Sequence, residues 1–100
     1  MNCIEIEKIN ESIKENIKLI GGRKTSSLDK AIARDSIVEN IGYLTRKYIY
    51  RMAISSQDPL AKEIHRMMRE VERELFVYLE YKNNYDFEIS EAYRKLTLFL

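Results

Sequence analysis

The sequence predicts an all-α protein, a compact bundle of about four helices, on three observations. Apolar residues recur every three or four positions through most of the chain, which is the helical period. Three glycines and one proline among 100 residues are too few for the tight turns of an all-β domain. Hydrophobic residues at 45% and charged residues at 33% are typical of one folded domain, expected to span residues 1–100. The helices are expected at roughly 3–20, 27–55, 59–82 and 87–100.

The first helix, over 3–20, carries a single narrow stripe made only of isoleucine. Its members follow one another in steps of three or four: Ile6, Ile9, Ile13, Ile17 and Ile20. Gly21 and Gly22 then stop the helix. A stripe this narrow resembles a coiled-coil seam, so we expect an outer helix whose isoleucines contact a second copy or a partner.

The second helix, over 27–55, is predicted to be long and central. Ser26 followed by Asp29 has the spacing of a capping box at its start. Its main apolar stripe is Ala33, Ile37, Ile41, Leu44, Tyr48 and Met52. Further apolar residues, among them Ile32, Val38, Ile49 and Ile54, extend the apolar surface beyond half of the circumference. Gly42 inside this helix costs about 1 kcal/mol relative to alanine and would permit a close helix crossing.

Two more helices follow. Asp58 before Pro59 predicts a helix start, because it places a capping residue before proline at the first helical position. The stripe of this third helix is Leu60, Ile64, Met67, Val71, Leu75 and Tyr78, and Asn83-Asn84 should break it. The last helix, over 87–100, should be capped by Asp86 or Ser90, and its apolar end predicts a docked C-terminus.

Charge is balanced overall but not along the chain. Lys and Arg number 17 against 16 Asp and Glu, yet residues 23–57 alone carry seven basic and three acidic side chains. The face of the second helix opposite its main stripe combines aromatic and basic residues at helical spacing: Tyr43, Arg46, Lys47 and Tyr50. With Arg23, Lys24 and Arg51 from the same basic block, these residues form a candidate nucleic-acid surface. The alternative is that the tyrosine rings pack in the bundle and the basic groups reach past them to solvent.

A second basic stripe lies on the polar face of the third helix. Its four cations over three turns could follow a phosphate backbone: Lys62, Arg66, Arg69 and Arg73. Glutamates border them at pairing distance, however, and mixed charge of this kind is ordinary on a solvated helix face.

Several function classes are excluded by the residue counts. The single cysteine allows no intramolecular disulfide, and one cysteine with one histidine cannot supply the four ligands of a structural zinc site. No apolar stretch reaches the roughly 18 residues of a membrane span. No Gly-rich phosphate loop, Ser-His-Asp set or Cys-His pair can be assembled. We therefore expect a soluble cytoplasmic protein that is no enzyme, with no metal, cofactor or small-molecule substrate.

The sequence favours a non-enzymatic helical interaction module: a regulator, adaptor or small accessory subunit. It would act by forming a homodimer or by docking on a larger protein. The alternative is a nucleic-acid-binding protein that uses the basic, tyrosine-containing face within residues 23–51. The sequence pI of about 7.8 is low for such a domain, and the second helix is too long for a recognition helix. The two functions could coexist in a dimer that pairs two of these helix faces.

Overall fold

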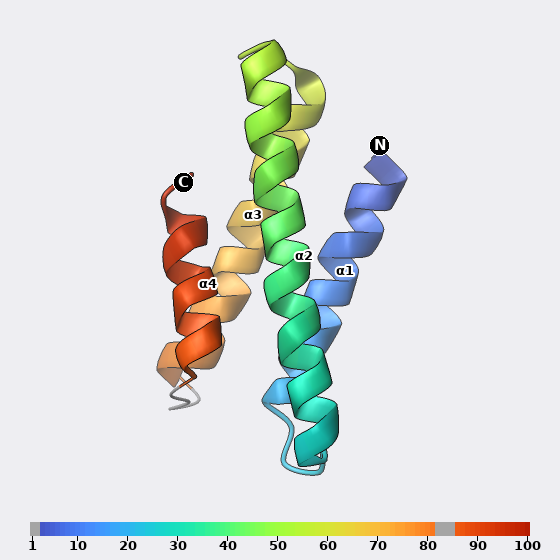
Figure 1. The fold of residues 1–100 in the computed structure, drawn as a ribbon, viewed down its shortest axis with the longest axis vertical. Helices are drawn as coiled ribbons and strands as arrows, with labels where there is room; N and C mark the ends of the chain where they lie inside the picture. The colour runs from blue at the N-terminus through green and yellow to red at the C-terminus, as the bar shows by residue number, and fades with distance from the viewer. Residues whose placement is uncertain (1–2, 82–85) are drawn as a thin grey trace.

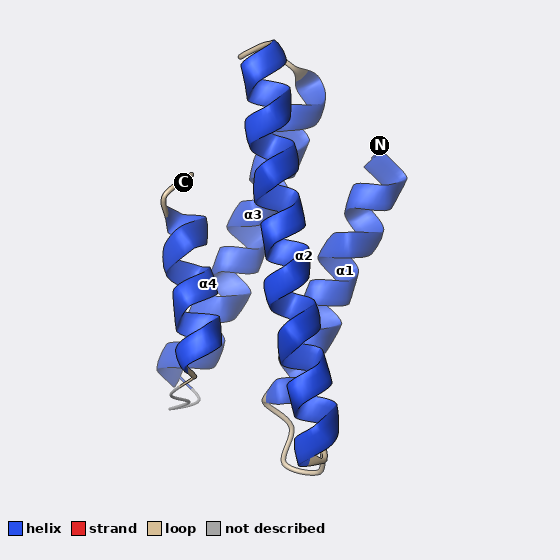
Figure 2. Ribbon diagram, viewed as in Figure 1, coloured by secondary structure: helices blue, strands red, loops and turns tan. Residues whose placement is uncertain are grey.

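A computed structural model, which describes residues 3–81 and 86–100, confirms the predicted four-helix, all-α bundle. The helices are α1 (Cys3–Ile20), α2 (Ser27–Ile54), α3 (Pro59–Phe76) and α4 (Phe87–Thr97), and a π-helical turn, η1 (Val77–Tyr81), extends α3. Within the described ranges no β-strand occurs (Figure 2).

The helices alternate in direction along the chain (Figure 1). α2 runs along the longest dimension of the molecule, 43 Å, and contacts each of the other three helices. α1 and α4 flank it, and α3 lies behind it; α4 runs in the same direction as α2, whereas α1 and α3 run in the opposite direction (Figure 1). The end of α2 and the start of α3 project beyond α1 and α4 as a helical hairpin (Figure 1). The prediction that the second helix is long and central is confirmed.

The predicted helix starts are set by local hydrogen bonds. The Ser26 hydroxyl accepts from the backbone N–H of Asp29 at 3.1 Å. The Asp58 carboxylate accepts from the N–H of Ala61 at 3.0 Å, with Pro59 at the first position of α3. Each bond satisfies a backbone donor that the helix leaves without an intrahelical acceptor. Of the two residues proposed to cap the last helix, Asp86 is the one that does so.

The isoleucine stripe of α1 lies inside the bundle. Ile6, Ile13, Ile17 and Ile20 are buried, and Ile9 packs against the core from its edge. α1 contacts both α2 and α3, and these two helices cover the whole of the narrow stripe. Four of the five isoleucines are therefore buried within the monomer, and Ile9 is partly exposed at the edge of the core, so the prediction that this stripe is a contact surface for a second copy or a partner is wrong for the folded chain.

The second half of the core is built by α3. Its predicted stripe is buried from Ile64 to Tyr78, and both adjacent methionines, Met67 and Met68, face the interior. The prediction of an α-helix over 59–82 is correct to Phe76, where the π-helical turn widens the coil. Residue 82 and the predicted break at Asn83-Asn84 lie outside the described residues.

The C-terminus is docked as predicted, although its helix ends early. α4 stops at Thr97, three residues before the predicted end, and a turn follows. Phe99 packs against the core, and its carbonyl accepts a hydrogen bond from Nε2 of His65 at 2.9 Å. The centroid of the His65 ring lies 5.3 Å from the centroid of the Tyr48 ring, so α2, α3 and the C-terminal turn meet at this point.

A polar cluster ties α1 to α3 at the edge of the core. The Glu70 carboxylate accepts from Nζ of Lys14 at 3.0 Å and from Nδ2 of Asn10 at 3.1 Å. Arg66 adds a third bond of 2.6 Å from the neighbouring turn of α3. The hydrogen bond from Lys14 is the main cause of a lowered pKa for Glu70. The charged form of Glu70 is thus favoured in the folded protein.

Shortening a buried isoleucine of α1 should destabilise the monomer itself. We expect Ile13→Ala to lower the free energy of unfolding by about 2–5 kcal/mol, because it opens a cavity in the core. Leu19→Ala, on the exposed side of the same helix, is the control and should cost less than about 1 kcal/mol. Urea unfolding monitored by circular dichroism measures both. Equal losses, or an Ile13→Ala loss that disappears at low protein concentration, where a dimer would dissociate, would return the stripe to a surface role.

Glu70 should make stability depend on pH in the acidic range. A carboxylate whose pKa is lowered on folding stabilises the protein above its unfolded pKa, and that contribution is lost as the pH falls through the folded pKa. Glu70→Gln should therefore lower the free energy of unfolding by roughly 1 kcal/mol at neutral pH, as expected for a half-exposed ion pair. At about pH 3 the deficit of the variant should be clearly smaller than at neutral pH, because protonation of the carboxyl group removes the charge that Lys14 and Arg66 bind. A deficit of the same size at both pH values would contradict this role for Glu70.

Candidate interaction surface

The outer face of α2 exposes large apolar side chains near both of its ends. The side of this helix that points away from the core is called the outer face below. Its exposed apolar residues are Leu28, Ile32, Ile49, Tyr50 and Ile54, each between 48% and 70% exposed. None of the five belongs to the core cluster, so the core is packed without them. Single exposed leucines are common, but two groups on one side of one helix make this side a candidate contact surface.

Charged residues occupy the middle of the outer face in a fixed order. Asp35 and Glu39 precede Gly42, and Arg46 and Lys47 follow it. Glu39 and Arg46 are both exposed. The outer face is thus acidic on the N-terminal side of Gly42 and basic on its C-terminal side.

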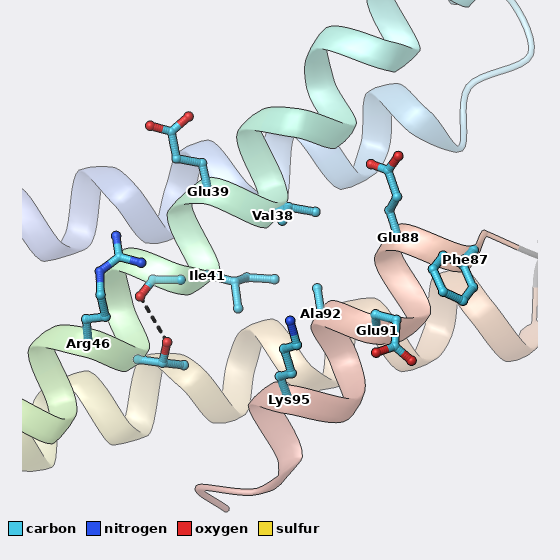
Figure 3. Close-up of a pocket in the computed structure, with 11 residues that line it drawn as sticks. Val38, Glu39, Ile41, Arg46, Phe87, Glu88, Glu91, Ala92 and Lys95 are labelled. Atoms are coloured by element: carbon cyan, nitrogen blue, oxygen red, sulfur yellow. Dashed lines mark hydrogen bonds between the residues drawn. The ribbon is translucent and has the colours of Figure 1, made fainter.

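An open groove of about 640 Å³ runs between α2 and α4 beside the outer face. Val38, Ile41 and Ala92 form its apolar lining, and Lys95 points into it (Figure 3). Arg46 lies at one end of the groove, and Phe87 and Glu88 lie at the other (Figure 3). α4 therefore repeats the order of charge on α2, with acidic residues before a basic one along parallel helices.

Gly42 forms part of this groove and is covered only lightly. A Cβ atom at Gly42 would lie 3.1 Å from Nη1 of Arg46. Arg46 therefore folds back over the glycine, and this long side chain can move aside without disturbing the backbone. With Arg46 displaced, another helix could approach the backbone of α2 closely at this point.

A partly buried ion pair attaches the start of α4 to α2, beside the groove. Nε of Arg34 on α2 lies 2.6 Å from Oδ2 of Asp86, whose other oxygen caps α4 by accepting from the N–H of Ile89. Asp86 is 8% exposed, so this charge has little contact with water. The hydrogen bond to Asp86 raises the pKa of Arg34, and burial raises the pKa of nearby Tyr78. One carboxylate thus both starts α4 and attaches it to α2.

The four aromatic and basic residues that the sequence placed together on α2 lie on its outer face: Tyr43, Arg46, Lys47 and Tyr50. The Lys47 ammonium lies 5.6 Å from the ring centre of Tyr43 and 6.0 Å from that of Tyr50, within the range of cation–π contacts. Tyr43 is half-buried, Tyr50 is exposed, and Arg46 lies on the same side. Of these four side chains, Tyr43 and Lys47 are partly buried, whereas Arg46 and Tyr50 are exposed and accessible to a ligand.

Two of the predicted nucleic-acid contacts already hold carboxylates. Arg51 binds Asp58 through two hydrogen bonds of 2.8 Å, which raises the pKa of Arg51 and lowers that of Asp58. Arg66 binds Glu63 at 3.0 Å and Glu70 at 2.6 Å. A phosphate would have to compete with these carboxylates for both guanidinium groups.

The remaining predicted contacts lie on other parts of the molecule. Arg69 and Arg73 are exposed on the side of α3 opposite its buried stripe, whereas α3 packs on α2 through that stripe. They therefore face away from the outer face of α2. Arg23 and Lys24 lie in the loop before α2, at the end far from Tyr50 (Figure 1). The structure does not bring the ten predicted basic and aromatic residues into one surface.

Comparison of the chain with protein-family models, with curated protein sequences and with solved structures found no match. Among the helices that the structure describes, none combines the length and the apolar character needed to cross a bilayer. No group of three or more His, Cys, Asp or Glu side chains within the described residues is placed to hold a metal ion.

Removing the Asp86 carboxylate should loosen α4. We expect Asp86→Ala to lower the free energy of unfolding by about 1–3 kcal/mol, because it removes a helix cap and leaves Arg34 without its partner. Glu88→Ala, in the first turn of the same helix and exposed, should cost less than about 1 kcal/mol. Urea unfolding compares the variants, and hydrogen exchange should show faster exchange in α4 of Asp86→Ala. Unchanged exchange there would show that other contacts hold α4.

Proposed function

We propose that this protein is a non-enzymatic interaction module that docks on another protein chain through the outer face of α2. The observation that carries the proposal is two groups of exposed apolar side chains on one side of α2, Leu28 with Ile32 near its start and Ile49, Tyr50 and Ile54 near its end, outside a core that is packed without them. Protein–protein interfaces combine apolar contact area with polar and charged groups, and this face offers both, apolar near its two ends and charged between them.

The energy available from this face is adequate for docking. Full burial of a leucine or isoleucine side chain stabilises by roughly 1.5–3 kcal/mol, so residues that are about half exposed would add on the order of 1 kcal/mol each. Five such residues could supply several kcal/mol before the entropic cost of association is subtracted. The gain suits a moderate affinity, typical of a regulator or accessory subunit.

Nucleic-acid binding is the second candidate, supported by Arg46, Lys47 and exposed Tyr50 on one side of α2. It has fewer cations to use, since Arg51 and Arg66 are paired with carboxylates. A salt titration with labelled DNA and RNA separates the candidates, because six phosphate contacts would cost about a thousandfold in affinity between ~50 and ~200 mM salt. Arg46→Ala with Lys47→Ala should weaken any such binding and flatten its salt dependence.

Site-specific photo-crosslinking tests the docking surface in cells that express the protein. A benzophenone side chain at Ile32 or Tyr50 should give discrete protein adducts, because both positions lie on the outer face. The same probe at Arg69, exposed on α3 and facing away from α2, is the matched control and should give none. Ile32→Asp should abolish the adduct formed from position 50, since a buried unpaired carboxylate opposes docking.

Two results would overturn this function. One is the absence of adducts from both α2 positions. The other is equal adducts from α2 and from position 69, which would show unspecific collision instead of a docking face.

A further inference from the structure

We propose that the partner of the outer face of α2 is a second copy of this chain, with the two α2 helices antiparallel across a two-fold axis near Gly42. The inference rests on the proposed function, because it takes the same face as the docking surface. It adds the identity of the partner and the orientation of the two chains.

The order of charge on α2 makes the face complementary to itself. An antiparallel second helix places its basic half, with Arg46 and Lys47, against the acidic half of the first, with Asp35 and Glu39. The two-fold axis repeats the contact, so Glu39 and Arg46 of each copy meet Arg46 and Glu39 of the other. A parallel arrangement would instead set Glu39 against Glu39 and Arg46 against Arg46, which repel.

The apolar residues are distributed in the same self-complementary way. Leu28 and Ile32 are exposed near the start of α2, and Ile49 and Ile54 are exposed near its end. Antiparallel packing brings the first pair onto the second pair of the other copy, once on each side of the axis. Each apolar group therefore gains an apolar neighbour, and each charged group gains one of opposite sign.

α4 supports the same orientation from beside α2. It runs parallel to α2 along the groove, and its Glu88 precedes its Lys95 as Glu39 precedes Arg46 (Figures 1 and 3). The acidic end of the groove therefore faces the basic end of the groove of an antiparallel second copy. The α4 helices at the sides of the interface therefore show the same charge complementarity as the α2 helices at its centre.

Gly42 lies at the centre of the proposed crossing. It has no side chain, and the atom nearest to its would-be Cβ belongs to Arg46, at 3.1 Å. When Arg46 turns toward Glu39 of the second copy, the backbone at Gly42 becomes accessible to the crossing helix. The residue that covers the glycine in the monomer is thus the one that the dimer uses.

The size of the face sets the expected affinity. A helix of 28 residues is about 42 Å long and about 10 Å wide, so two such faces bury roughly 840 Å² in total, below the about 1,200 Å² of stable complexes and in the range of weak, transient ones. We therefore expect a reversible dimer with a dissociation constant on the order of 10 µM.

Sedimentation velocity over a concentration series of the purified full chain tests the proposal with a charge-exchange set. Glu39→Arg and Arg46→Glu should each weaken self-association at least tenfold, because each makes both cross-helix pairs repulsive. An equimolar mixture of the two variants, and the double variant Glu39→Arg with Arg46→Glu, should recover the association of the parent protein. Arg69→Glu, on the opposite side of the bundle, is the matched control and should associate like the parent.

Recovery in the mixture also shows that both single variants are folded, so weak association of either variant alone cannot be ascribed to misfolding. A parent protein that stays monomeric at about 500 µM would overturn the proposal. Single variants that associate like the parent, or a double variant that does not recover, would overturn the antiparallel pairing. Face-specific photo-crosslinks to a different protein, together with a monomeric parent, would leave the docking function in place and remove only the second copy as its partner. The absence of any face-specific adduct would remove both.

Discussion

The length of α2 is the constraint on which the rest of the structure depends. It has 28 residues, against 18 each in α1 and α3 and 11 in α4. The shorter helices cover one side of it and bury Ile37 and Leu44, but they leave its outer face uncovered. Because α2 is apolar beyond the covered side, the bundle has a packed core and a further apolar surface at the same time.

The sequence predicted most of the fold because helix starts depend on local hydrogen bonds. Ser26, Asp58 and Asp86 each cap a helix within three residues, so their spacing alone identifies the boundaries. The isoleucine stripe of α1 was placed wrongly for a physical reason. A stripe buried between two helices of the same chain has the same period as one buried against a partner, and only the arrangement of the helices distinguishes them.

The candidate surface was predicted in part. Helical spacing placed Tyr43, Arg46, Lys47 and Tyr50 on one side of α2, and the structure keeps them there. The pairing of Arg51 with Asp58 spans a loop, and the groove beside α4 joins residues about 50 positions apart, so neither follows from the period of one helix. Because these tertiary contacts occupy Arg51 and separate the other basic residues, they favour a protein partner over a nucleic acid.

Hydroxyl-radical footprinting at low and high protein concentration tests most directly whether the outer face of α2 becomes covered. At about 1 µM the protein should be mainly monomeric, and Ile32, Ile49 and Tyr50 should react as exposed side chains. At about 500 µM we predict that their reactivity falls severalfold, while exposed Phe76 on α3 keeps its reactivity. Equal reactivity of the three α2 side chains at both concentrations would contradict self-association through this face.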